Sequence, residues 1–186
     1  MNNERETRPG RAAKAVPAAK RPARRKGHLE LVRGEEDARL FIHLLLNFLH
    51  RTDRERRGIY DGDLDLAAVG ETVGLVSIEP ESRKPEFREK FGNFLTVMGL
   101  EGQRPVNALT ISAATGIPRE TVRRKLKLLL ARGVITEKAR GAYVIKPGFI
   151  QQPEILATVE RGMRDTMQFL NDCIRLGLVQ WVDDGG

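Results

Sequence analysis

Residues 109–135 read LTISAATGIPRETVRRKLKLLLARGVI and carry the clearest structural pattern in this chain. Its first half is apolar and ends at Gly116, a residue that suits the tight turn after a short helix. Pro118 follows, and a proline is tolerated in the first turn of a helix, where its missing N–H costs nothing. The pattern predicts two helices, over residues 107–114 and 118–132, joined by a turn at Gly116.

The second of these helices has an apolar side and a cationic side. Its apolar residues recur at helical spacing and predict burial in a core: Val122, Leu126, Leu129 and Leu130. The rest of its circumference carries Arg119, Glu120, Arg123, Arg124 and Lys127. Lys125 borders the apolar side, and we expect its ammonium to reach out to water. The cationic side is either an ordinary solvated surface or a surface that contacts phosphate.

The segments on either side complete a recognisable order of elements. After Gly133, two alternating runs over residues 134–138 and 142–146 flank a glycine turn and predict a β-hairpin. Upstream, apolar residues at helical spacing predict a helix over residues 85–98. Helix, short helix, glycine turn, cationic helix and hairpin predict a winged helix-turn-helix over residues 83–149. The predicted fold class is mostly α with a small β-wing, flanked by N- and C-terminal helices.

Residues 109–135 resemble the DNA-binding domains of bacterial one-component regulators of the IclR and MarR type. The matching elements are the Thr115-Gly turn, the Thr121-Val pair with the Arg that follows, two leucines three residues apart, and Gly133 followed by two aliphatic residues. The match departs at Ser112, where an alanine is common, and the flanking helices match neither family's ligand or dimer domain. The resemblance implies that the helix over residues 118–132 enters the major groove of DNA.

Groove geometry then assigns roles along that helix. The major groove is about 12 Å wide, so the first two turns of an inserted helix face base edges and later cations meet the backbone. The candidates for base readout are Arg119, Glu120, Thr121 and Arg123. The candidates for phosphate contact are Arg124, Lys127, and the wing residues Lys138 and Arg140.

The charge distribution favours a polyanionic partner. The formal net charge of +7 divides into +7 for residues 1–34, −5 for 35–102, +8 for 103–149 and −3 for 150–186. Solubility alone does not require two cationic blocks set against two acidic ones. The block over residues 103–149 coincides with the predicted winged domain, so we expect double-stranded DNA as the partner.

The segments outside the winged domain receive separate predictions. Residues 1–33 combine Pro, Ala, Gly and like charges with little to bury, and we expect a disordered basic arm. Residues 34–82 are expected to be a helical region for dimerisation or sensing, with one helix from Glu35 to about Thr52 and a short helix through Leu64–Val69. Residues 150–186 are expected to hold a long helix that begins at Pro153 and makes a homodimer contact.

Several other classes of function are disfavoured. No Cys/His spacing fits zinc, and the acidic run over residues 61–65 fails the calcium-loop pattern, so we expect no metal and no cofactor. We expect no enzyme activity, because there is no phosphate-binding glycine motif and no nucleophile with a base near it. Cys173 is interpreted as a packing residue. No run of apolar residues could span a membrane, so a cytoplasmic, nucleoid-associated location is expected.

Together these patterns predict a sequence-specific transcriptional regulator that binds an inverted-repeat operator as a homodimer. The alternative is a winged-helix protein-interaction module or an architectural DNA-associated module, in which the basic arm provides non-specific affinity. Whether a small-molecule effector exists is left open by the sequence.

Overall fold

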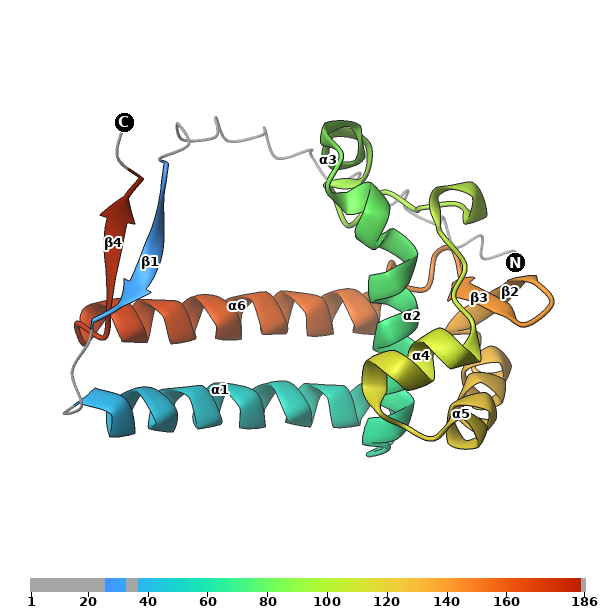
Figure 1. Cartoon of the computed structure of the whole chain (residues 1–186), viewed down its shortest axis with the longest axis horizontal. Helices are drawn as coiled ribbons and strands as arrows, with labels where there is room; N and C mark the ends of the chain where they lie inside the picture. The colour runs from blue at the N-terminus through green and yellow to red at the C-terminus, as the bar shows by residue number, and fades with distance from the viewer. Residues whose placement is uncertain (1–25, 33–36, 185–186) are drawn as a thin grey trace, which may run out of the picture.

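The chain is mostly helical, with a small β part, in a computed structural model that describes residues 26–32 and 37–184. This confirms the predicted class, mostly α with little β. The helices are α1 (Ala38–Ile59), α2 (Leu64–Ser82), α3 (Pro85–Phe91), α4 (Ala108–Thr115), α5 (Arg119–Ala131) and α6 (Pro153–Arg175), with a 3₁₀ turn, η2 (Leu100–Gly102) (Figure 1). The strands are β1 (Gly27–Leu31), β2 (Ile135–Ala139), β3 (Ala142–Ile145) and β4 (Val179–Asp183).

One hydrophobic core is shared by α2, α4, α5 and the hairpin of β2 and β3, which we call the core unit. Side chains from each of these elements are almost fully buried: Leu66 and Val73 of α2, Ile111 of α4, Leu126 and Leu129 of α5, Ile135 of β2 and Val144 of β3. An isolated bridge between Val106 and Tyr143 ties the segment before α4 to the hairpin. Gly141 adopts a φ of 73° at the hairpin turn, as the sequence predicts.

The helix that opens the core unit is α2. The helix predicted over residues 85–98 begins at Pro85 as predicted but ends at Phe91, and none of its residues belongs to the core cluster. The chain turns instead at Gly92-Asn93, where the Asn93 side chain accepts the Leu95 N–H at 2.9 Å. The short helix predicted through Leu64–Val69 continues to Ser82. The core unit therefore includes α2, which precedes the domain boundary predicted at residue 83.

Helices α1 and α6 form a second part of the molecule, a layer of two long antiparallel helices (Figure 1). The ring of Phe169 stacks on Phe48 at 5.2 Å between centroids and meets Phe41 edge-on at 6.1 Å. Two turns further along, Arg161 Nε lies 2.7 Å from Glu55 Oε2. Helix α1 thus runs past its predicted end near Thr52, because its polar second half is held by charges on α6.

The predicted disordered arm over residues 1–33 is wrong at Gly27–Leu31, which form strand β1. This strand pairs antiparallel with β4, a strand that was not predicted. A side chain at position 27 would collide with Trp181, because a Cβ there would lie 2.5 Å from a ring carbon. Each strand needs the other for its hydrogen bonds, and the two are about 150 residues apart in sequence, so periodicity alone could not pair them. Residues 1–25 lie outside the described residues.

The turn between α1 and α2 holds the core unit against the end of α1. Asp63 Oδ1 accepts the Leu66 N–H at 2.9 Å at the start of α2, and Asp63 Oδ2 accepts a hydrogen bond from Lys125 Nζ of α5. The Lys125 residue is only 8% exposed. The expectation that its ammonium reaches water is therefore wrong, since Asp63 lies within reach. On the outside of the same turn, Asp61 Oδ2 lies 2.9 Å from Arg132 Nη2.

We predict that Asp63→Asn lowers the free energy of unfolding by about 2 kcal/mol, because it leaves the buried Lys125 ammonium without an opposite charge. The matched variant Asp61→Asn removes the same charge from the more exposed pair with Arg132 and should cost less than about 0.5 kcal/mol. Urea unfolding followed by circular dichroism measures both. Equal losses for the two variants would show that the Asp63–Lys125 pair adds nothing.

The same pair predicts a dependence of stability on pH. The hydrogen bond from Lys125 lowers the pKa of the Asp63 carboxyl below its ordinary value of 3.8. Because the folded pKa lies below the unfolded one, the contribution is complete above the ordinary value and is lost as pH falls through the folded value. We expect the unfolding free energy to fall more steeply from pH 5 to pH 2 in the wild type than in Asp63→Asn.

Candidate nucleic-acid interface

The turn between α4 and α5 is closed by hydrogen bonds from side chains that the sequence places there. Asn107 Oδ1 accepts the N–H groups of Leu109 and Thr110 at 3.0 Å and so caps α4. Gly116 ends α4 with a φ of 72°. Ser112 Oγ donates to Ile117 O at 2.7 Å across the turn. The serine that departs from the resembled families thus holds the α4–α5 turn closed.

Helix α5 turns its cationic side to solvent. Its apolar side is buried as predicted at Val122, Leu126 and Leu129, with Leu130 half-buried. The exposed residues on the opposite side are Arg119, Glu120, Arg123, Arg124 and Lys127, while Thr121 is half-buried. Of the residues predicted to read bases, Thr121 is therefore the least accessible.

Arg119 and Arg123 meet the hairpin at a shared hollow of about 290 Å³. Asn107 at the start of α4 and Gly141 and Tyr143 of the hairpin supply other parts of its wall. Residues that lie up to 36 positions apart in sequence thus border one depression. Two guanidinium groups lie beside the hollow. They can donate hydrogen bonds to acceptors that enter it, such as guanine edges or phosphate oxygens.

Some of the cations on this surface are paired with a carboxylate of the same chain, and others are not. Arg123 Nη1 forms an ion pair with Glu120, one turn earlier on α5, so two base-readout candidates contact each other in the free chain. Four other cations form no ion pair with any described residue: Arg119, Arg124, Lys127 and Arg140. Since residues 103–149 carry a net charge of +8, these four leave an excess of positive charge on the exposed side of α5 and at the hairpin tip.

The structure separates the two hairpin cations that the sequence grouped as phosphate contacts. Lys138 Nζ donates to the carbonyl oxygens of Leu100 at 2.7 Å and Gln103 at 2.8 Å, so it holds the η2 turn against β2. Gln103 is itself buried and donates to Ile145 O at 3.0 Å. Arg140 lies exposed at the hairpin tip. Of these two residues, only Arg140 has a charged group that can contact a phosphate without breaking a hydrogen bond within the described residues.

Sequence reasoning missed Asn107 and Tyr143 as members of this surface. Asn107 carries the signal of a helix cap, an Asn directly before an apolar helix, but that signal says nothing of the arginines that lie beside it. Tyr143 stands in an alternating run and is half-buried. Burial raises the pKa of its phenol above the ordinary value of 10.0, so the group is neutral and a hydrogen-bond donor at physiological pH, as an ordinary tyrosine is.

A second hollow, of about 570 Å³, lies between α2, α3 and the segment after β3. Its aromatic lining comes from Phe87, Phe91 and Phe94. Two of the polar side chains in its lining already have partners: Gln151 Nε2 donates to Phe94 O at 2.7 Å, and the Glu71 carboxylate accepts from Arg56 at 2.9 Å. No ligand chemistry is singled out by this arrangement.

Residues 26–32 and 37–184 hold no cluster of three or more His, Cys, Asp or Glu side chains that could bind a metal ion. Nor do they contain a helix with the length and apolar composition needed to cross a membrane. Cys173 is 1% exposed, and burial raises the pKa of its thiol, which lowers the thiolate fraction.

A scan against protein-family models, a search of curated proteins and a search of solved structures each find no match to this chain. The function therefore has to be argued from the residues themselves.

We predict that Lys138→Met lowers the free energy of unfolding by about 1 to 2 kcal/mol, because it leaves two carbonyl oxygens of the η2 segment without their charged donor. Methionine keeps most of the unbranched stem of the lysine side chain, so packing changes little. Arg140→Met, which removes the same charge from the hairpin tip, should change stability by less than about 0.5 kcal/mol. Thermal and urea unfolding measure the difference, and indistinguishable variants would leave Lys138 without a structural role.

Proposed function

We propose that this protein is a transcriptional regulator that binds double-stranded DNA sequence-specifically, as a homodimer on an inverted repeat. In this proposal the core unit is a winged helix-turn-helix, in line with the resemblance to regulators of the IclR and MarR type. The observation that carries the proposal is the convergence of Arg119 and Arg123 with the hairpin at one hollow, on a surface with an excess of exposed cations.

The first two turns of α5 are proposed to read base edges in the major groove. An arginine can donate to guanine O6 and N7 together, and a carboxylate can accept from cytosine N4. Arg119 and Arg123 are assigned the first role, Glu120 the second, and Thr121 a smaller contact. An exposed ion pair such as Arg123–Glu120 contributes little to stability, so exchanging it for base contacts costs little.

Contacts to the DNA backbone are assigned to later positions. Arg124 and Lys127 lie five and eight residues after Arg119 on α5. Arg140 lies at the hairpin tip, where the wing of a winged helix meets the neighbouring DNA backbone. Lys138 is assigned an indirect part, since it holds the hairpin to the η2 turn. Two-fold symmetry would place the half-sites about 34 to 36 Å apart, or a multiple of one helical turn.

An architectural or protein-recruiting module is the second candidate. The observation in its favour is the net charge of +7 over residues 1–34, which adds affinity without sequence preference. A salt titration with selected and random duplexes separates the two functions. A regulator keeps a large specificity ratio while the affinity for both duplexes falls with salt, whereas an architectural protein shows a ratio near one at every salt concentration.

We predict that Arg123→Ala, and separately Arg119→Ala, weakens binding to the cognate duplex by about 1 to 3 kcal/mol and relaxes preference at one base position. The duplex is identified by in vitro selection from random sequences, and affinities come from fluorescence anisotropy. Arg83→Ala is the matched control, because Arg83 is an equally charged, 79% exposed side chain after α2, outside the proposed interface. Unchanged binding to every duplex in both test variants would refute the assignment.

A further inference from the structure

The first half of helix α1 is strongly apolar, yet the chain itself buries none of the residues of this helix. The segment Phe41–Leu49 contains seven large apolar side chains in nine positions. Three of them point away from the core unit and from α6, with exposed fractions of 53% at Ile42, 50% at Leu46 and 46% at Leu49. A helix of this composition is stable in water when neighbouring surfaces cover it on several sides.

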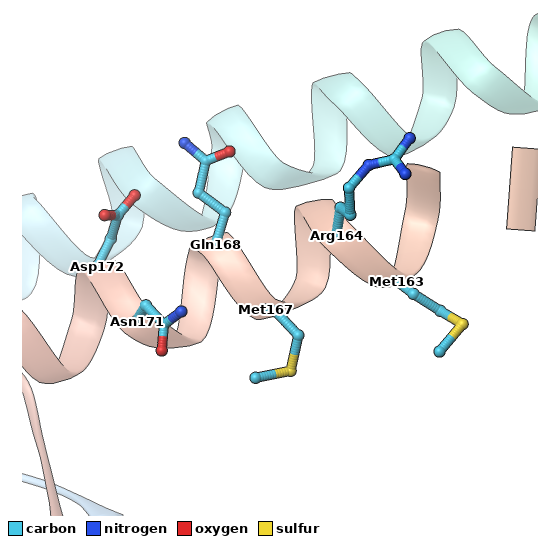
Figure 2. A pocket seen from close by; sticks show the side chains of 6 residues that line it. All are labelled: Met163, Arg164, Met167, Gln168, Asn171 and Asp172. Atoms are coloured by element: carbon cyan, nitrogen blue, oxygen red, sulfur yellow. The ribbon is translucent and has the colours of Figure 1, made fainter. Parts of the chain in front are cut away.

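Helix α6 buries Ile155 and Cys173 but also leaves large apolar side chains exposed. Met163 is 59% exposed, Met167 is 54% exposed and Ile174 is 51% exposed, with Leu170 half-buried between them. Figure 2 shows Met163 and Met167 on the side of α6 that faces away from α1. These four positions are spaced 4, 3 and 4 residues apart, and Ile42, Leu46 and Leu49 are spaced 4 and 3. This is the a/d spacing by which one helix packs on another.

Helix geometry places both sets of side chains on one side of the two-helix layer. Phe48 and Phe169 stack on each other, so each marks the side of its helix that faces the partner helix. Each residue adds about 100° of rotation about the helix axis. Measured in this way from Phe48 on α1 and from Phe169 on α6, the exposed apolar side chains of each helix are rotated by about 120° in the same sense. Because α1 and α6 are antiparallel, equal rotations turn both sets toward the same side of the layer.

The opposite side of the layer is polar. It carries exposed polar and charged residues from both helices: His43, Asn47, His50, Arg54, Arg164, Gln168 and Arg175. The layer is therefore amphipathic as a whole, with one apolar face made of Ile42, Leu46, Leu49, Met163, Met167, Leu170 and Ile174.

We propose that this apolar face packs against the same face of a second copy, and that the two layers form a four-helix bundle around a two-fold axis. A symmetric contact requires one patch that is complementary to itself, and two parallel stripes of a/d side chains on a layer of two helices meet that requirement. A shallow hollow of about 420 Å³ marks the edge of this face on α6, because Met163 and Met167 line it together with the polar residues Arg164 and Gln168 (Figure 2).

The size of the face fits this partner. The face spans residues 42–49 on α1 and 163–174 on α6, and its six most exposed residues are 46–59% exposed. Covering them would bury about 600 Å² on each copy, or about 1,200 Å² in total, which is at the lower end of the range of specific, stable interfaces. The inference rests on the proposed function for the identity of the partner, since an inverted repeat calls for a second copy of the same chain.

Sedimentation equilibrium of the full chain without DNA, from about 1 to 50 μM, tests the proposal. The wild type should sediment as twice its 20.9 kDa mass. Leu46→Glu and Met167→Glu put a charge into the apolar face and should weaken self-association by about 100-fold or more. Both positions are half-exposed in one copy, so circular dichroism should show unchanged helix content.

Matched controls carry the same charge one residue later, on the polar side of the layer. Asn47→Glu and Gln168→Glu should remain dimers. A monomeric wild type at 50 μM, or equal behaviour of test and control variants, overturns the proposal. So does a monomer that co-sediments through this face with anionic phospholipid vesicles, since a lipid surface would then be the occupant.

DNA binding distinguishes failure of this inference from failure of the proposed function. A wild type that is dimeric and binds no selected duplex keeps the interface and refutes the regulator. A wild type that is monomeric and binds a single half-site specifically refutes the interface and keeps DNA recognition.

Discussion

The ion pair between Asp63 and Lys125 joins the two parts of the molecule. Asp63 lies in the turn that ends α1 and begins α2, while Lys125 lies in the middle of α5. By drawing Lys125 inward, the pair fixes the rotation of α5 about its axis and leaves Arg119, Arg123 and Arg124 on the outside. It also holds the core unit at one end of α1, so the position of the cationic surface depends on the two-helix layer.

Two surfaces with opposite chemistry result from this arrangement. The exposed side of α5 and the hairpin carries unneutralised cations, which suits a polyanion. The two-helix layer carries the apolar face, which suits a second apolar surface. Their separation on different parts of the chain would allow one copy to bind DNA and another copy at the same time, because neither contact would cover residues needed for the other.

The candidate site was predictable to the extent that it lies within one helix. The division of α5 into a buried side and a cationic side follows from residue spacing, and the structure reproduces it. The separate roles of Lys138 and Arg140 did not follow, because the carbonyl groups that Lys138 contacts belong to Leu100 and Gln103, more than 30 residues earlier. The place of Tyr143 beside the arginines likewise depends on how the hairpin folds back on α4.

Helices α4, α5 and α6 and the hairpin follow from local sequence, because periodicity, a cap and glycine turns specify each of them. That α2 and not residues 85–98 completes the core follows from packing, since Leu66 and Val73 are buried against α5 and the hairpin while Gly92-Asn93 ends the competing helix. The pairing of β1 with β4 is likewise decided by the tertiary structure. Those choices depend on contacts between residues distant in sequence, whose energies local patterns do not contain.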